Sequence, residues 1–383
     1  MNYSEIQQRI DVLSQRWFTE RPERQGRSTL SGSDFDALRQ AGFPQVAVPT
    51  EHGGAFVDVA HSVRPICGIL RSLAHGDSSV ALVCAMHPAV LSNWLLRPQS
   101  VELYASAWQS QRSQVFSAAK EGAFFGTITS EPGSGGDIGL TRAVAHRRGT
   151  QYLLDGQKHF GSGLGMVHYM ITTAVPEGET EPDWFLLDVH DAKWDGGDGM
   201  TLVAPWDGRG MTATQSHSVN FHGFPAIRHA WPGQRRSLSL AAAPLISCLF
   251  GAVIVGIVDT AMSISRAQLA SNRIPRRSFE QLEWVRAEID AWLLEQALDG
   301  MLREAEKPQP SDRVSTQGKI ALAELAESCL SRLGRISGGS SYSRRSPIGH
   351  LLEDVRALGF LRPPWGLAFE TLLASCQWQI PSQ

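Results

Sequence analysis

The sequence has no marked excess of charge of either sign. Its 383 residues include 35 Lys and Arg and 38 Asp and Glu, which gives a formal net charge of −3. The basic residues are scattered along the chain without a run of five. A protein that binds nucleic acid usually carries a basic stripe or patch, because it must neutralise phosphates. We therefore expect no nucleic-acid partner.

Cysteine is scarce, and metal-binding patterns are missing. The five cysteines are odd in number and include no CxxC pair, a pattern typical of a reducing compartment. The histidines show neither HxH nor HExxH spacing, so we expect no metal site. The first seventeen residues, MNYSEIQQRIDVLSQRW, lack the unbroken apolar core of a signal peptide. These features favour a cytoplasmic protein.

One long run without charge could suggest a membrane span. Residues 237–258 contain no charged side chain, and their number is nearly sufficient to cross a bilayer. The run also contains Pro244 and several small residues, and it continues into a polar segment of helical pattern. Small residues allow helices to pack closely inside a globular fold as well. We interpret the run as a buried core helix and expect no membrane partner; the membrane alternative rests on length alone.

The periodicity of apolar residues changes twice along the chain, and 42% of the residues are hydrophobic, as in globular proteins. Helical spacing predicts helices at 3–18, 31–41, 57–73, 79–94 and 101–109, and again at 238–270, 279–306, 313–337, 347–358 and 366–376. Between them, short β-branched or aromatic runs predict strands at 124–130, 141–149, 151–160, 168–175, 183–189, 200–206 and 217–224. The sequence thus predicts an α+β protein with a helical domain (1–118), a β domain (119–235) and a second helical domain (236–383).

Two clusters of glycine and serine follow successive strands of the β domain. Residues 127–137 read TITSEPGSGGD, and residues 156–165 read GQKHFGSGLG. Small side chains let backbone N–H groups come close to a flat or anionic ligand. A single cluster could equally be a run of β-turns. The pair of clusters indicates a cofactor cradle.

Four stretches together resemble the acyl-CoA dehydrogenase superfamily, including its flavin-dependent monooxygenase branch, over nearly the whole chain. TSEPGSGGD at 129–137 is similar to the family's flavin loop T-E-P-x-A-G-S-D, and YLLDGQKHFGS at 152–162 resembles Y-x-L-N-G-x-K-x-W-I-T. GMTATQSHSVNF at 210–221 and ISGGSSY at 336–342 are similar to the G-M-R-x-T-x-S and I-x-G-G-x-G-Y segments. The resemblance implies an N-terminal helical domain, a central β barrel and a C-terminal four-helix bundle.

The resemblance also implies a flavin, FAD or FMN, which needs hydrogen bonds at the edge of its ring, a wall on each face and partners for its phosphates. By this resemblance the cofactor-binding residues are Thr127, Thr129, Ser130, Gly135, Gly136, Phe160, Ser162, Arg273, Arg335, Gly338 and Gly339. Phe160 stands where the family has Trp, and the Arg273 segment is shorter than the family's R-x-x-F-G form. Arg273 could equally belong to a solvated helix connection. Since the family takes part of its cofactor site from a neighbouring subunit, we expect a homodimer or homotetramer.

The reaction depends on whether a carboxylate base is present. An acyl-CoA dehydrogenase needs one beside the thioester to remove the α-proton, and most of the family carries it about eight residues after an R-D-A helix. Here no Asp or Glu stands between Asp354 and Glu370. Another branch carries the base on an earlier helix, but the corresponding residues 249–253 read LFGAV. Ordinary acyl-CoA dehydrogenation is therefore disfavoured.

The monooxygenase branch needs no such base. There, reduced flavin from a separate flavin reductase reacts with oxygen to a C4a-peroxide or hydroperoxide, which must be kept from water and contacted by polar groups. By resemblance, Ser162 is the candidate hydrogen-bond donor, and His87 is a second catalytic candidate; the alternative for His87 is a core histidine. Leu361 stands where a His is usual in this branch. We prefer a small-molecule monooxygenase. The alternatives are an atypical dehydrogenase of acyl-CoA or carrier-bound acyl groups, and a catalytically inactive structural paralogue that binds flavin poorly.

Overall fold

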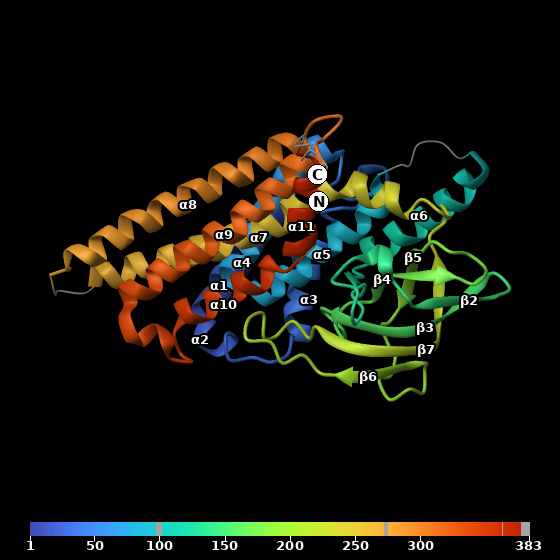
Figure 1. The fold of residues 1–383 in the computed structure, drawn as a ribbon, viewed down its shortest axis with the longest axis horizontal. Helices are drawn as coiled ribbons and strands as arrows, with labels where there is room; N and C mark the ends of the chain where they lie inside the picture. The colour runs from blue at the N-terminus through green and yellow to red at the C-terminus, as the bar shows by residue number, and fades with distance from the viewer. Residues whose placement is uncertain (97–101, 272–274, 362, 377–383) are drawn as a thin grey trace, which may run out of the picture.

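The computed structural model describes residues 1–96, 102–271, 275–361 and 363–376. Helices occupy its first third (Figure 1): α1 (Tyr3–Thr19), α2 (Arg21–Arg24), α3 (Gly32–Ala41), α4 (Val59–Gly76), α5 (Ser78–Leu95) and α6 (Ala105–Lys120). The start of α1 is fixed by a capping box, in which Asn2 and Glu5 bond each other's backbone N–H. Asp58 and Asp77 cap α4 and α5 by accepting from backbone N–H groups of the first turn.

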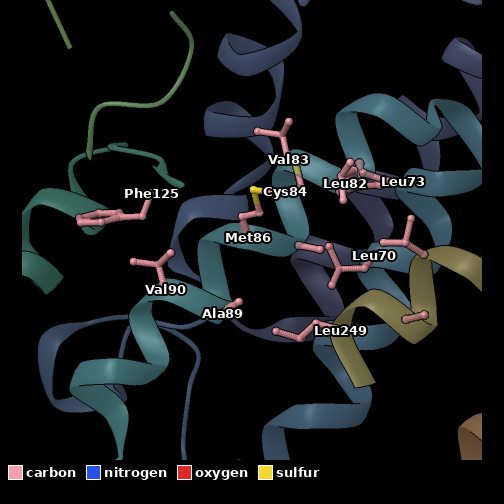
Figure 2. Packing of buried hydrophobic residues seen from close by; sticks show 14 of the residues in the cluster. Leu70, Leu73, Leu82, Val83, Cys84, Met86, Ala89, Val90, Phe125 and Leu249 are labelled. Carbon is pink, nitrogen blue, oxygen red and sulfur yellow. The ribbon is translucent and has the colours of Figure 1, made fainter. Parts of the chain in front are cut away.

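The central helix of the molecule is α5. Its residues from Ser78 to Trp94 are all buried, so it has no solvent face. Figure 2 shows side chains of α5, among them Cys84 and Val90, lying between Leu70 of α4, Leu249 of the later helix α7 (Arg235–Ser271) and Phe125 at the start of the sheet. The hydrophobic core therefore runs without interruption from the first helices through the sheet to the last helices.

The middle of the chain forms seven strands whose pairings close on themselves. They are β1 (Phe125–Thr127), β2 (Val144–Arg148), β3 (Gln151–Gly161), β4 (Tyr169–Pro176), β5 (Asp183–Asp188), β6 (Met200–Ala204) and β7 (His217–Arg228). Pairing runs β4–β2–β3–β7–β5 and returns from β5 to β4, with β1 added to β4 and β6 to β7. Such a circuit is the connectivity of a β barrel. Each of the seven predicted segments contains a strand, although β1 is shorter than the predicted 124–130 and β7 extends beyond the predicted 217–224.

The last third is again helical, with α7, α8 (Ser278–Ala305), α9 (Asp312–Ser337), the short helix η5 (Gly338–Tyr342), α10 (Pro347–Gly359) and α11 (Trp365–Ala374). In Figure 1, α7, α8 and α9 lie side by side as long rods. Two described helices, α5 and α7, are long and apolar enough to cross a bilayer by length and composition. However, 94% of the apolar window of α5 and 78% of that of α7 are buried inside the fold. This burial favours the core interpretation of residues 237–258.

One predicted helix differs clearly from the observed one. The segment predicted at 101–109 begins at Ala105 and continues to Lys120, while residue 101 lies outside the described ranges. The reason is a buried stripe of Trp108, Val115, Phe116 and Ala119. Its spacing follows one face of a helix, so the helix continues for as long as that face packs against the core.

Candidate cofactor site

A buried ion pair joins the two glycine-containing loops. Lys158 on β3 has a side chain with 0% exposure, and its Nζ lies 2.5 Å from Glu131 Oε1, 2.9 Å from Thr141 Oγ1 and 2.6 Å from the carbonyl oxygen of Thr173. The backbone N–H of Arg142 donates to Glu131 Oε2 at 2.7 Å. Burial alone would raise the pKa of Glu131, but the hydrogen bonds from Lys158, Thr141 and Arg142 outweigh it and lower that pKa. The loop after β1 is therefore held firmly against β3.

The glycines of the first loop leave its backbone open on one side. Gly135 has a φ of 60°, and a Cβ added there would meet nothing within 4 Å. Gly136 has a φ of 85°, and its added Cβ would come 2.8 Å from Pro364 Cγ. Beside them, the backbone N–H of His159 donates to the carbonyl oxygen of Ser130 at 2.8 Å, which keeps the end of β3 next to this loop. The loop thus offers open backbone to a ligand on one side and contacts the segment before α11 on the other.

Three residues here adopt a backbone conformation that side chains disfavour. In the described ranges, the non-glycine residues with positive φ are Phe160 (61°), Met211 (52°) and Gln215 (49°). Phe160 is also 55% exposed, and its ring lies edge-on to that of Trp206 with the centroids 6.1 Å apart. Such a strained backbone persists only where the surrounding structure imposes it, and residues of this kind cluster at functional sites. Phe160 thus presents a flat aromatic surface, which fits the wall that an isoalloxazine ring requires.

Ser162 lies beside Phe160 and begins a chain of hydroxyl groups. Its side chain is buried, and its Oγ lies 2.7 Å from Ser216 Oγ. Ser216 Oγ lies 2.7 Å from Thr214 Oγ1, which donates to the carbonyl oxygen of Met211 at 2.8 Å. Ser216 and Thr214 were not among the predicted site residues. The available signal was the alternation of hydroxyl side chains in TATQS just before β7, inside a family-like stretch.

The loop that carries Thr214 and Ser216 is anchored by Asp354 of α10. Asp354 Oδ1 accepts from the backbone N–H of Met211 at 2.6 Å, and its other carboxylate oxygen accepts from the hydroxyl of Ser78. Burial raises the pKa of Asp354, although these hydrogen bonds act in the opposite direction. Asp354 thus joins α10, α5 and the loop before β7. This anchoring role was not predicted from the sequence, in which Asp354 only bounds the stretch without an acid.

His87 on α5 lies in the core with both ring nitrogens engaged. Its side chain is fully buried, Nε2 lies 2.8 Å from the carbonyl oxygen of Pro44, and Nδ1 lies 3.2 Å from the backbone N of Phe125. A carbonyl can only accept and an amide N–H can only donate, so the neutral ring with its proton on Nε2 satisfies both contacts. Burial lowers the pKa of His87 to about 4. This arrangement favours the core alternative, and its catalytic role stays a prediction.

The residues predicted for the outer half of the cofactor lie at a second place. Arg335 and Gly338 line a cavity of about 590 Å³ together with Arg209, Arg344 and Arg356. Glu353 also lines it and pairs with Arg356 at 2.8 Å, so the arginines outnumber the acid and the lining is basic on balance. Arg335 also bonds Glu283 at 2.8 Å. Gly339 belongs to η5 at the edge of this region, and Arg273 lies outside the described residues. Two groups therefore emerge: Thr127, Thr129, Ser130, Gly135, Gly136, Phe160 and Ser162 near the strands, and Arg335, Gly338 and Gly339 at the end of α9.

The homologues and structural neighbours of the chain are flavoproteins of acyl-CoA dehydrogenase fold, which confirms the resemblance. No family model matches the chain. Amino sugar nitrososynthase DnmZ of Streptomyces peucetius is 27% identical over 367 residues, which cover 88% of this chain and 84% of that protein. The putative acyl-CoA dehydrogenase YdbM of Bacillus subtilis is 23% identical over 369 residues, 89% of this chain and 88% of the relative.

Solved structures agree on the fold. KijD3 in complex with FMN and dTDP-3-amino-2,3,6-trideoxy-4-keto-3-methyl-D-glucose superimposes with a TM-score of 0.81 at 20% identity, covering 97% of this chain and 93% of that chain. No group of three or more His, Cys, Asp or Glu that could hold a metal ion occurs within the described ranges. The exposed aromatic ring, the open glycine backbone and the buried hydroxyl at the end of β3 fit a flavin.

Proposed function

We propose that the chain is a flavin-dependent monooxygenase that receives reduced flavin from a separate reductase and oxidises a small molecule. The observation that carries this proposal is the lack of an available carboxylate where a dehydrogenase keeps its base. No acid stands between Asp354 and Glu370 in the sequence. Asp354 is bonded to Ser78 and Met211, and Glu131 is bonded to Lys158. These hydrogen bonds stabilise the charged form of each carboxylate, which weakens it as a base.

The chain's own residues would hold the flavin from several sides. The ring of Phe160 would cover one face, and the open backbone at Gly135 would lie along an edge. Ser162 would meet the N5 side, as the resemblance implies. The Glu131–Lys158 pair keeps these parts in fixed relation, and fixed contacts lose less entropy on binding. Reduced flavin, when bound, supplies two electrons and activates oxygen.

We further propose that the basic cavity at Arg335 and Gly338 serves phosphates, either of FAD held jointly with a neighbouring subunit or of a nucleotide-linked substrate. Its arginines match phosphate groups in charge and geometry. Two relatives are named amino sugar nitrososynthases, and the structural neighbour KijD3 was solved with a dTDP-linked amino sugar, so nucleoside diphosphate amino sugars are the first substrates to test. We also propose that the chain is divided into three domains, residues 1–118, 119–235 and 236–383.

We also propose that the chain forms a homo-oligomer. Large apolar side chains stand exposed along α8, namely Phe279, Leu282, Val285, Ile289 and Trp292. Their spacing follows one face of the helix, and a second copy of the chain would remove this face from water.

The proposal is tested by titrating the purified chain with FMN and FAD, each oxidised and reduced, under anaerobic conditions. We expect reduced flavin to bind. When oxygen is then added together with a nucleoside diphosphate amino sugar, we expect one oxygen molecule to be consumed for each product molecule that gains one oxygen atom, the other oxygen atom leaving as water. Reduction of bound flavin by saturated acyl-CoA would instead favour the dehydrogenase, and Glu131, Asp137 and Glu370 would then be tested as bases. A chain that bound no flavin in either state would favour the structural paralogue.

A further inference from the structure

The three hydroxyl groups beside Phe160 have only one arrangement of protons that satisfies all their contacts. Each hydroxyl has one proton to donate and can accept with its lone pairs. Thr214 Oγ1 lies 2.8 Å from the carbonyl oxygen of Met211, which can only accept, so Thr214 donates there. Its proton is then used, and Ser216 must donate to Thr214 across 2.7 Å. By the same reasoning Ser162 must donate to Ser216, also across 2.7 Å.

The consequence is a fixed polarity at Ser162. Its single proton points into the protein toward Ser216, so toward any ligand Ser162 Oγ offers lone pairs. Thr214 and Ser216 are buried, which limits the ability of bulk water to supply a different partner. Turning the chain round would lose the bond from Thr214 Oγ1 to the carbonyl oxygen of Met211. That carbonyl oxygen would still accept from Trp206 Nε1 at 2.8 Å, so the reversed chain makes one hydrogen bond fewer without leaving the carbonyl unpaired.

The backbone around the three hydroxyls is held in place from both sides. Met211 and Gln215, which flank Thr214, both have positive φ. The amide of Gln215 accepts from the backbone N–H of Leu30 at 3.0 Å and donates to the carbonyl oxygen of Leu164 at 3.1 Å. Asp354 fixes Met211 from α10. The structure thus imposes strained backbone at the two places that aim Thr214 at its carbonyl.

We propose that Thr214 and Ser216 are positioning residues that make Ser162 a hydrogen-bond acceptor, and that the site thereby selects reduced over oxidised flavin. This rests on the proposed function and on the place of Ser162 at the N5 side. Reduced flavin carries a proton on N5 and can donate to Ser162. Oxidised flavin has only a lone pair at N5, which would face another lone pair. The expected role of Ser162 as a donor is thereby reversed.

Selection for the reduced form suits an enzyme supplied by a separate reductase, because spent oxidised flavin leaves and reduced flavin replaces it. The gain is one net hydrogen bond, which corresponds to roughly a few-fold to tenfold in the ratio of the two dissociation constants. For a two-electron couple each tenfold change in that ratio moves the midpoint potential of the bound flavin by about 30 mV. Tighter binding of the reduced form raises the potential.

The test compares Thr214→Val with Thr214→Ser. Valine keeps the shape but gives Ser216 no acceptor, so Ser216 can turn its proton to Ser162, and Ser162 can then donate to oxidised N5. Serine keeps the hydroxyl and the polarity. We expect the ratio of the dissociation constant of oxidised FMN to that of reduced FMN to fall a few-fold to about tenfold in Thr214→Val, and to keep its wild-type value in Thr214→Ser. Ser216→Ala frees the Ser162 proton directly and should lower the ratio as well.

The measurements are anaerobic equilibrium titrations with FMN in each redox state, and the midpoint potential of bound FMN for each variant, with far-UV circular dichroism as a check on folding. Equal ratios in wild type, Thr214→Val and Ser216→Ala would overturn the proposed polarity while leaving flavin binding intact. If Thr214→Val did not fold, Ser216→Ala would decide by the same criterion. Failure of the wild type to bind either FMN or FAD in either redox state would instead overturn the proposed function.

Discussion

Replacing Lys158 by methionine should destabilise the protein strongly, because it leaves a buried carboxylate without a cation. The side chains of Lys158 and Glu131 are 0% and 4% exposed, and Lys158 Nζ has three oxygen partners within 2.9 Å. Methionine fills similar space but supplies no proton. Breaking a buried pair by removing one partner typically costs about 3–5 kcal/mol. Because whole domains are stable by only about 5–15 kcal/mol, most of the stability could be lost.

The predicted loss of stability should also depend on pH. In the wild type the pKa of Glu131 is lowered below its usual value of 4.5, so its contribution is present at neutral pH and is lost as pH falls through the lowered pKa. In Lys158→Met burial would dominate and raise that pKa. The variant would then recover stability as pH falls, because the buried carboxylate becomes neutral. We therefore expect the difference between wild type and variant to be largest at pH 7 and to shrink toward pH 5.

The assay is urea unfolding at pH 7 and pH 5, followed by far-UV circular dichroism and tryptophan fluorescence. Lys193→Met serves as the matched control, since Lys193 is exposed and exposed substitutions usually change stability by less than about 0.5 kcal/mol. The double variant Lys158→Met/Glu131→Gln removes both charges and should lose less than Lys158→Met alone. A loss below about 1 kcal/mol in Lys158→Met, or one that is equal at both pH values, would refute the reasoning.

Three further predictions follow from the structure. His87→Gln should keep both hydrogen bonds of the histidine and remove an acid-dependent loss of stability. Because burial lowers the pKa of His87 from 6.5 to about 4 in the folded protein, the wild type should lose about 3 kcal/mol of stability as pH falls between these values. The same loss in the variant would contradict this assignment. Saturated acyl-CoA thioesters should leave bound oxidised flavin unbleached under anaerobic conditions, whereas bleaching at dehydrogenase rates would show that a base exists. Static light scattering at micromolar concentration should give the mass of a dimer or a larger assembly. Trp292→Glu should weaken this assembly, because the Trp292 side chain is 61% exposed on α8. A monomeric mass for the wild type would contradict the assembly.

Most helices could be predicted from the sequence because their burial follows the helical period. The helix predicted at 3–18 is observed at Tyr3–Thr19, and its start is visible in the sequence as Asn2 followed by Glu5. The last strand was less predictable. The sequence predicts a strand at 217–224, yet β7 continues to Arg228 with Pro225 opposite Leu153. Proline has no N–H to donate within a sheet, so a continuation past it is not expected from the sequence. The pairing with β3 and β5 continues β7 past the proline, and a single strand does not reveal its neighbours.

The site could be predicted only in part, because a single stretch of sequence does not reveal which residues it contacts in the fold. Ser162 could be predicted by resemblance, since it stands in a recognisable stretch. Its partner Ser216 is 54 residues away, and the two meet through pairing of β3 with β7 across a register shift between Lys158 and Gly161. Glu131 and Lys158 are 27 residues apart, and nothing local in either stretch indicates that they form a buried pair. Contacts of this kind depend on register, which only the folded sheet defines.

The left-handed residues Phe160, Met211 and Gln215 also set a limit on how this enzyme can be engineered for heat resistance. A left-handed conformation costs a non-glycine residue about 1–2 kcal/mol, so glycine at these positions would be an obvious gain in a search for stabilising substitutions. At Gln215 the same substitution would remove the amide that bonds Leu30 and Leu164. At Phe160 it would remove the exposed ring. A heat-stable variant should therefore be sought by changes elsewhere in the chain, since greater stability at these three positions would come at the expense of the site.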